Sequence, residues 1–225
     1  MLLTILRDEI RLLTFRPLSP AIRTHSNAFL AFGLFFTWLA GLGRYWDNPR
    51  AELWQYLGLG SVIYVFVLAL IVWLLLSPFR PKHWSYKMVL TFITLTAPPA
   101  VLYAIPVEQF MSADAAETTN VWFLAAVAAW RVALFSVFLK RVAELSAFEV
   151  IVGTLTPLAI IVVSLTALNM EHVVINIMGG LAPEQRSSND AVYGVVVALS
   201  VFSVLATPVL LICYGVLCAR ASKRA

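Results

Sequence analysis

Long apolar stretches, interrupted by few charges, recur along this chain and limit what it can fold into. A helix needs about 20 apolar residues to cross the hydrocarbon core of a bilayer, within a range of about 17–25. Five stretches reach that length, at residues 57–78, 88–106, 121–139, 150–168 and 191–218. A sixth, residues 28–46, is apolar only as far as Gly43, and Tyr45 and Trp46 extend it as an interfacial aromatic belt.

The overall composition also indicates that the chain lies in lipid. Hydrophobic residues make up 61% of the 225 residues and charged residues 12%, whereas a soluble domain is about 45–50% apolar and about 25% charged. An open sheet would leave backbone groups unpaired in lipid, and the alternating ten-residue strands of a barrel are absent from the sequence. We therefore predict an all-α integral membrane protein, a bundle of about six transmembrane helices.

Basic residues cluster on one side of the predicted spans, which gives the bundle an orientation. The side that carries the N-terminus holds twelve of them: Arg7, Arg11, Arg16, Arg23, Arg80, Lys82, Lys87, Lys140, Arg141, Arg220, Lys223 and Arg224. The opposite side holds only Arg44, Arg50 and Arg186, beside eight acidic residues. Since cytoplasmic loops are enriched in Lys and Arg, we predict that both termini are cytoplasmic. A five-span chain without residues 28–46 would place the basic N-terminal segment outside.

The first 27 residues precede the spans and have an amphipathic pattern. Apolar residues recur there at helical spacing, at Leu2, Leu6, Ile10 and Leu13. The charged residues Arg7, Asp8 and Arg11 lie on the other side of such a helix. This pattern fits a short helix in the membrane interface, and a helix packed on the cytoplasmic end of the bundle fits equally well. Residues 28–218 would then form the transmembrane domain and residues 219–225 a basic cytoplasmic tail.

Arg131 lies near the middle of the predicted span 121–139 and is the sharpest polar feature of the chain. A central arginine costs about 2.5–3.5 kcal/mol or more on insertion, so such residues face the bundle interior or a wet cavity. The natural partner is Glu149 at the start of the next span, with Glu144 as second choice. As a functional site, Arg131 would be a fixed charge in a polar pathway or an anion site. As a structural one, its ion pair would hold two helices in register.

Three predicted spans carry proline close to threonine near mid-membrane, at Thr96 with Pro98, Thr156 with Pro157 and Thr207 with Pro208. Proline removes a backbone hydrogen bond and kinks a helix, and a threonine hydroxyl can help to satisfy the freed carbonyl. Broken helices of this kind expose backbone to substrate in transporters. Kinked helices also occur in membrane bundles that have no transport role, where they only shape the bundle.

The predicted outer loop over residues 169–190 is the longest of the chain and mixes polar with apolar residues. Glu171, His172 and Asn176 stand there within an apolar run. We expect an interfacial or re-entrant piece that caps the outer face of the bundle, or an extension of the preceding helix.

Small residues form stripes on two predicted spans. Ala125, Ala129 and Ala133 recur at four-residue spacing, as do Gly194 and Ala198. Small residues at this interval let helices approach closely. The pattern favours contact within the bundle over dimerisation.

Catalytic and cofactor-binding motifs are missing from the sequence. It contains neither clustered metal ligands nor the short signatures of metalloproteases, serine hydrolases or P-loop nucleotide binders. We therefore predict no enzyme activity, no cofactor and no metal site. Basic residues set between apolar runs suit anionic lipid headgroups and leave no surface for nucleic acid.

Two functional hypotheses follow from these patterns. The leading one is a non-enzymatic scaffold, assembly factor or accessory subunit of a membrane complex, which acts with a protein partner or as a homo-oligomer. The alternative is a small transporter or channel that uses a polar pathway around Arg131 and the kinked helices. Arginine outnumbers lysine twelve to four, which hints at a bacterial inner membrane.

Overall fold

The structure, a computed structural model, describes residues 1–43, 46, 52–167 and 191–223. Every regular element in these ranges is helical, in agreement with the predicted all-α class. In chain order the elements are α1 (Leu2–Leu13), α2 (Ala21–Thr24), α3 (Ser26–Gly43), α4 (Leu53–Tyr56), α5 (Leu59–Leu76), η1 (Ser77–Phe79), α6 (Tyr86–Leu95), η2 (Pro98–Ala104), η3 (Val107–Gln109), α7 (Ala113–Arg141), α8 (Ala147–Ala167) and α10 (Ala191–Lys223), where η marks a 3₁₀ helix.

Five of the described helices are long and apolar enough to cross a membrane. They are Ser26–Gly43, Leu59–Phe79, Thr118–Arg141, Ala147–Ala167 and Ala198–Lys223. Each overlaps one of the apolar stretches predicted from the sequence. A helix satisfies its backbone hydrogen-bonding groups internally, so a long apolar run can adopt this conformation in lipid.

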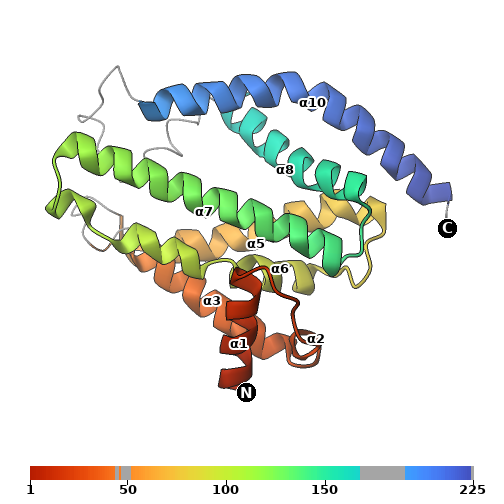
Figure 1. The fold of residues 1–225 in the computed structure, drawn as a ribbon, viewed down its shortest axis with the longest axis horizontal. Helices are drawn as coiled ribbons and strands as arrows, with labels where there is room; N and C mark the ends of the chain where they lie inside the picture. Colours follow the sequence, from red (N-terminus) through yellow and green to blue (C-terminus); the bar gives the residue numbers. More distant parts are fainter. Residues whose placement is uncertain (44–45, 47–51, 168–190, 224–225) are drawn as a thin grey trace.

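The long helices lie side by side, and helices that follow one another in the chain run in opposite directions (Figure 1). α3 packs on α5 and α6, α7 packs on α8, and α8 packs on α10. The connections from α5 to α6 and from α7 to α8 lie at the same end of the bundle as the C-terminus (Figure 1). α10 packs mainly on α8 and forms an edge of the bundle, with 11% of its span buried against 33% for α8.

α6 is the central helix of the core. Every residue from Val89 to Leu95 is buried, although α6 is only ten residues long. The neighbouring α5 contributes a face with helical spacing, at Val65, Ala69, Val72 and Leu76. From Val89 to Leu95, α6 therefore packs on protein all round, whereas the longer helices each keep an exposed apolar face.

The stretch predicted as a single span over residues 88–106 is in two pieces. α6 begins after Ser85, whose hydroxyl accepts a hydrogen bond from the Met88 amide at 3.2 Å, and it ends at Leu95. The 3₁₀ helix η2 then runs over Pro98–Ala104. Its first two residues are prolines, so two successive amide donors are missing, and the α-helix does not continue.

Two connections at the basic end of the bundle are tied together. The Lys82 amide donates to the Ala143 carbonyl at 3.0 Å, and the Lys82 ammonium group lies 2.7 Å from a Glu144 carboxylate oxygen. The hydrogen bond from the Lys82 ammonium group, together with the charge of Lys82, lowers the pKa of Glu144 below its ordinary value. The α5–α6 and α7–α8 connections therefore form one surface.

The N-terminal segment forms α1, which lies across the flank of the bundle instead of along it (Figure 1). The predicted apolar stripe is exposed at Leu2, Leu6 and Ile10. The inner side of α1 carries charge, since Asp8 and Glu9 are 1% and 5% exposed. α1 thus exposes Leu2, Leu6 and Ile10 and buries Asp8 and Glu9, together with Ile5 and Leu12, against the bundle.

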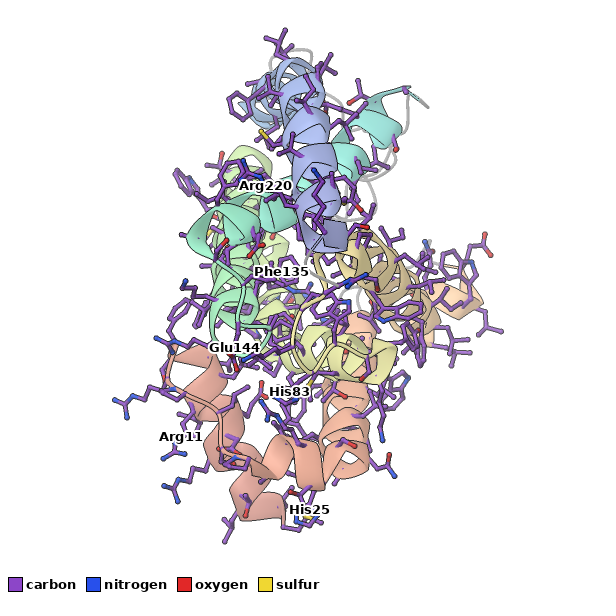
Figure 2. All side chains as sticks on the ribbon, turned by 90° about the vertical axis from the view of Figure 1, so that its right-hand side faces the viewer. Arg11, His25, His83, Phe135, Glu144 and Arg220 are labelled. Atoms are coloured by element: carbon purple, nitrogen blue, oxygen red, sulfur yellow. The ribbon has the colours of Figure 1, made fainter. Side chains whose placement is uncertain are left out.

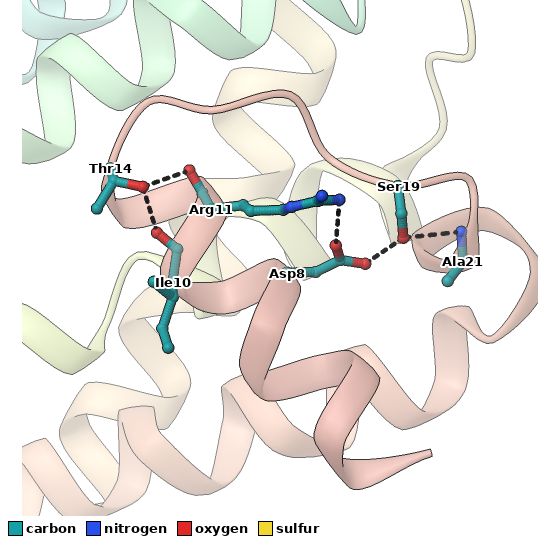
Figure 3. Close-up of polar contacts among 6 residues, drawn as sticks. All are labelled: Asp8, Ile10, Arg11, Thr14, Ser19 and Ala21. Atoms are coloured by element: carbon teal, nitrogen blue, oxygen red, sulfur yellow. Dashed lines mark hydrogen bonds and ion pairs between the residues drawn. The ribbon is translucent and has the colours of Figure 1, made fainter.

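Asp8 links α1 to the start of α2 (Figure 3). Its carboxylate accepts a hydrogen bond from the Ser19 hydroxyl and lies 3.7 Å from the Arg11 guanidinium group. The Ser19 oxygen also accepts from the Ala21 amide at 3.3 Å. These contacts fold the chain back on itself between α1 and α2.

Candidate functional site

Arg131 on α7 contacts Thr96, the residue directly after the end of α6. Its Nε donates to the Thr96 hydroxyl oxygen at 3.2 Å, and the Thr96 hydroxyl donates to the Ile93 carbonyl at 2.7 Å. Thr96 is 3% exposed, while Arg131 is half-buried. The structure therefore brings together two candidates that are 35 residues apart in the chain.

Aromatic packing sets the register that allows this contact. The rings of Phe92 on α6 and Phe138 on α7 are stacked with centroids 4.1 Å apart, and Phe135 lies 6.1 Å from Phe92. Seen along the bundle, Phe135 lies near its middle (Figure 2). One helical turn separates Phe92 from Thr96 and Phe135 from Arg131, so the contact of Phe92 with Phe135 aligns the arginine with Thr96.

Along α7, Arg131 stands between residues of two apolar clusters. On one side is a small cluster of Ala40, Ala100 and Val127. On the other is the main core, to which α7 contributes Leu134 one turn beyond Arg131. A charge in such surroundings is strongly attracted to any polar group within reach. The site can hold helices in register or bind an anion.

Hydroxyl groups continue the polar contacts from α7 to α8. The oxygens of Ser136 and Thr154 are 3.2 Å apart, and Thr154 is buried. Two residues on, the buried Thr156 hydroxyl has no hydrogen-bond partner among the described residues. Pro157 follows it, and α8 continues through this proline without a break.

Glu149 and Glu144 have other contacts in the structure. Glu149 forms a reciprocal cap at the start of α8, where it accepts from the Ser146 amide at 2.8 Å while its own amide donates to the Ser146 hydroxyl at 3.4 Å. Glu144 binds Lys82 at the surface. An ion pair between Arg131 and Glu149 remains a prediction from the sequence.

The last threonine–proline pair lies on the edge helix. The Thr207 hydroxyl donates to the Ser203 carbonyl at 2.6 Å, one residue before the carbonyl of Val204, which Pro208 leaves without an amide. α10 packs mainly on α8, so the pair belongs to a different helix interface from that of Arg131 and Thr96.

The predicted outer-face residues Glu171, His172 and Asn176 lie outside the described residues. Within residues 1–43, 46, 52–167 and 191–223, no three His, Cys, Asp or Glu side chains come together as metal ligands.

The alanine stripe of α7 lies on the surface of the chain. Ala125, Ala129 and Ala133 are all exposed. The sequence favoured packing of this stripe within the bundle, but the opposite face of α7, at Val127 and Leu134, is the one that packs inward. An exposed stripe leaves room for a second helix.

A pocket beside the N-terminal segment was not predicted from the sequence. It has a volume of about 220 Å³ and lies between the α1–α2 connection and the last turns of α7. Arg16, Arg23 and Arg141 line it. The sequence signal was the density of arginine in the N-terminal segment, but only folding brings Arg141 next to the other two.

No protein-family model, no curated protein and no solved structure matches this chain.

Proposed function

We propose that the chain crosses the bacterial inner membrane six times, with both termini in the cytoplasm. α6 provides about 15 Å at 1.5 Å per residue, and η2 about 14 Å at 2.0 Å per residue. Together they match a hydrocarbon core of about 30 Å, which makes α6 with η2 the sixth span. The two connections tied by Lys82 and Glu144 carry basic residues and lie at one end of the bundle, which supports the orientation.

In this proposal α1 lies in the cytoplasmic interface of the bilayer. The Trp130 indole donates to the Leu13 carbonyl at 3.0 Å, and Arg141 donates to the Phe15 carbonyl. The end of α1 is therefore held between Trp130 and the end of α7, a stretch of about 16 Å. Interfacial helices lie about 5–10 Å below the headgroups, and the outward apolar stripe of α1 suits that depth.

The function supported best is that of a non-enzymatic scaffold, assembly factor or accessory subunit. The observation that carries it is the exposed alanine stripe at Ala125, Ala129 and Ala133. Small side chains offer lipid chains little contact area, whereas a partner helix can approach the α7 backbone closely at this stripe. The edge position of α10, which packs mainly on α8, adds a second apolar surface for assembly.

Cross-linking in membranes tests this function. In a chain with Cys213 and Cys218 replaced by serine, Ala129→Cys should form a disulfide-linked dimer, or a stoichiometric product with a cysteine-bearing partner, on mild oxidation. Leu70→Cys, on the exposed face of α5, is the matched control and should remain uncross-linked.

A bulky residue at the same position provides the converse test. Ala129→Leu should reduce the assembled fraction in mild detergent several-fold while the thermal unfolding of the chain stays close to that of wild type, because a larger side chain keeps a partner helix away. Recovery of the wild-type protein only as a monomer, with no product from Ala129→Cys, would exclude the scaffold function.

The alternative is a small transporter or channel, and the half-buried Arg131 beside the break after α6 favours it. A hydrated pathway should make Val127→Cys and Phe135→Cys, one turn on either side of Arg131, react with water-soluble thiol reagents. Ala115→Cys, an exposed position near the start of α7, is the control and should react in either case. Unreactive cysteines at 127 and 135 would leave Arg131 as a dry, structural contact.

A further inference from the structure

The pocket beside the N-terminal segment combines a basic rim with an apolar wall. Arginine side chains come from two distant parts of the chain: Arg16 lies in the α1–α2 connection and Arg23 on α2, whereas Arg141 ends α7. The apolar wall consists of Leu12, Ile22, Leu134, Val137 and Phe138. Such a pocket suits a molecule with an anionic group at one end and hydrocarbon at the other.

Specific contacts hold the pocket in shape. The Asp8 carboxylate accepts a hydrogen bond from the Ser19 hydroxyl, which closes the loop between α1 and α2 (Figure 3). Residues of this loop and of the end of α7 line the pocket together. Arg141 donates to the Phe15 carbonyl from the opposite wall. Leu12 and Ile22 are 6% and 5% exposed, so the flanking helices are anchored by burial.

The charge around the pocket is positive. Among the described residues no carboxylate lies within 4 Å of the guanidinium groups of Arg16, Arg23 or Arg141. The acid whose charge interacts with Arg23 is Glu144, and it is already hydrogen-bonded to Lys82. An anion in the pocket would therefore contact arginines that form no ion pair with a described carboxylate. A phosphate can accept hydrogen bonds from guanidinium groups with good geometry.

We propose that this pocket binds an anionic phospholipid, with the headgroup phosphate between Arg16, Arg23 and Arg141 and the acyl chains against the apolar wall. The inference uses the proposed position of α1 in the interface but not the scaffold function. A lipid at this place would link α1 to the end of α7, and the protein would be most stable in a membrane with anionic lipid.

The test uses the full-length protein in detergent, with its thermal unfolding followed as lipid is added. Phosphatidylglycerol should raise the melting temperature in a saturable way, and phosphatidylcholine with the same acyl chains should not. In Arg16→Gln/Arg23→Gln the phosphatidylglycerol concentration for half the effect should rise about tenfold or more, since the headgroup phosphate would lose the guanidinium donors of two of the three arginines that line the pocket. Both side chains are exposed, and Arg141 keeps its bond to Phe15.

Arg7→Gln/Arg220→Gln is the matched control, because it removes the same charge from two exposed positions that do not line the pocket. It should leave the response to phosphatidylglycerol unchanged. An equal loss in this control would overturn the proposal in favour of diffuse attraction to a basic surface. A stabilisation by inorganic phosphate alone that matches that of the lipid would also overturn it and would indicate a small-anion site. Neither result would affect the cross-linking test at Ala129.

Discussion

Gly33→Leu should destabilise the folded chain more than any other single change proposed for it. A Cβ atom at Gly33 on α3 would lie 2.8 Å from the Thr94 Cβ and 2.9 Å from the Thr94 backbone carbonyl carbon. Backbone cannot move aside as the end of a flexible side chain can, so α3 and α6 would have to separate. Overpacking of a core costs about 1–3 kcal/mol and occasionally more, and a leucine at this contact belongs at or above the top of that range.

Reversible unfolding in mixed detergent micelles would measure this effect. Gly215→Leu on α10 is the matched control, because nothing lies within 4 Å of a Cβ built at Gly215. It should unfold close to the wild-type midpoint. If Gly33→Leu were as stable as Gly215→Leu, the close packing of α3 on α6 would be wrong.

Glu9→Gln should remove a pH dependence of the N-terminal segment. Burial raises the pKa of Glu9 from an ordinary value of 4.5 to about 8. Among the described residues neither of its carboxylate oxygens has a hydrogen-bond partner, so the folded chain favours the neutral acid. The folded pKa is the higher one; the stabilisation by the bound proton is therefore complete below about pH 4.5 and is lost as the pH rises to about 8.

At pH 7 this proton linkage costs about 3 kcal/mol, at about 1.4 kcal/mol for each pH interval between the two pKa values. The wild-type chain should therefore lose protection of the α1 amides between pH 5 and pH 8, as followed by hydrogen exchange. In Glu9→Gln the protection of the α1 amides should stay constant between pH 5 and pH 8, and at pH 8 it should exceed that of the wild type. Glu52→Gln, an exposed acid, is the control and should behave as wild type. Parallel curves for the wild type and Glu9→Gln would show that Glu9 is not buried as a neutral acid.

The long apolar helices were predictable from the sequence because their cause is local. A run of about 20 apolar residues forms a helix in lipid whatever surrounds it, since the helix satisfies its own backbone. The break after Leu95 could be read in part, because Pro98 and Pro99 each remove a donor. The burial of seven successive α6 residues and the 3₁₀ helix after them could not, since they depend on packing by α3, α5 and α7.

The polar contacts were decided only by the tertiary structure. Charge predicted an ion pair of Arg131 with Glu149, and this stays a prediction. The hydrogen bond from Arg131 to Thr96 was not expected, because it depends on how Phe92 packs against Phe135 and Phe138. Periodicity marked the apolar face of α1 but not the direction in which it points, and the structure turns that face outward and buries Glu9. Distances between side chains depend on the rotation and register of whole helices, and these follow from how all the faces fit together. Local sequence carries the length and polarity of each helix, which is why it determines the spans and leaves the contacts between them open.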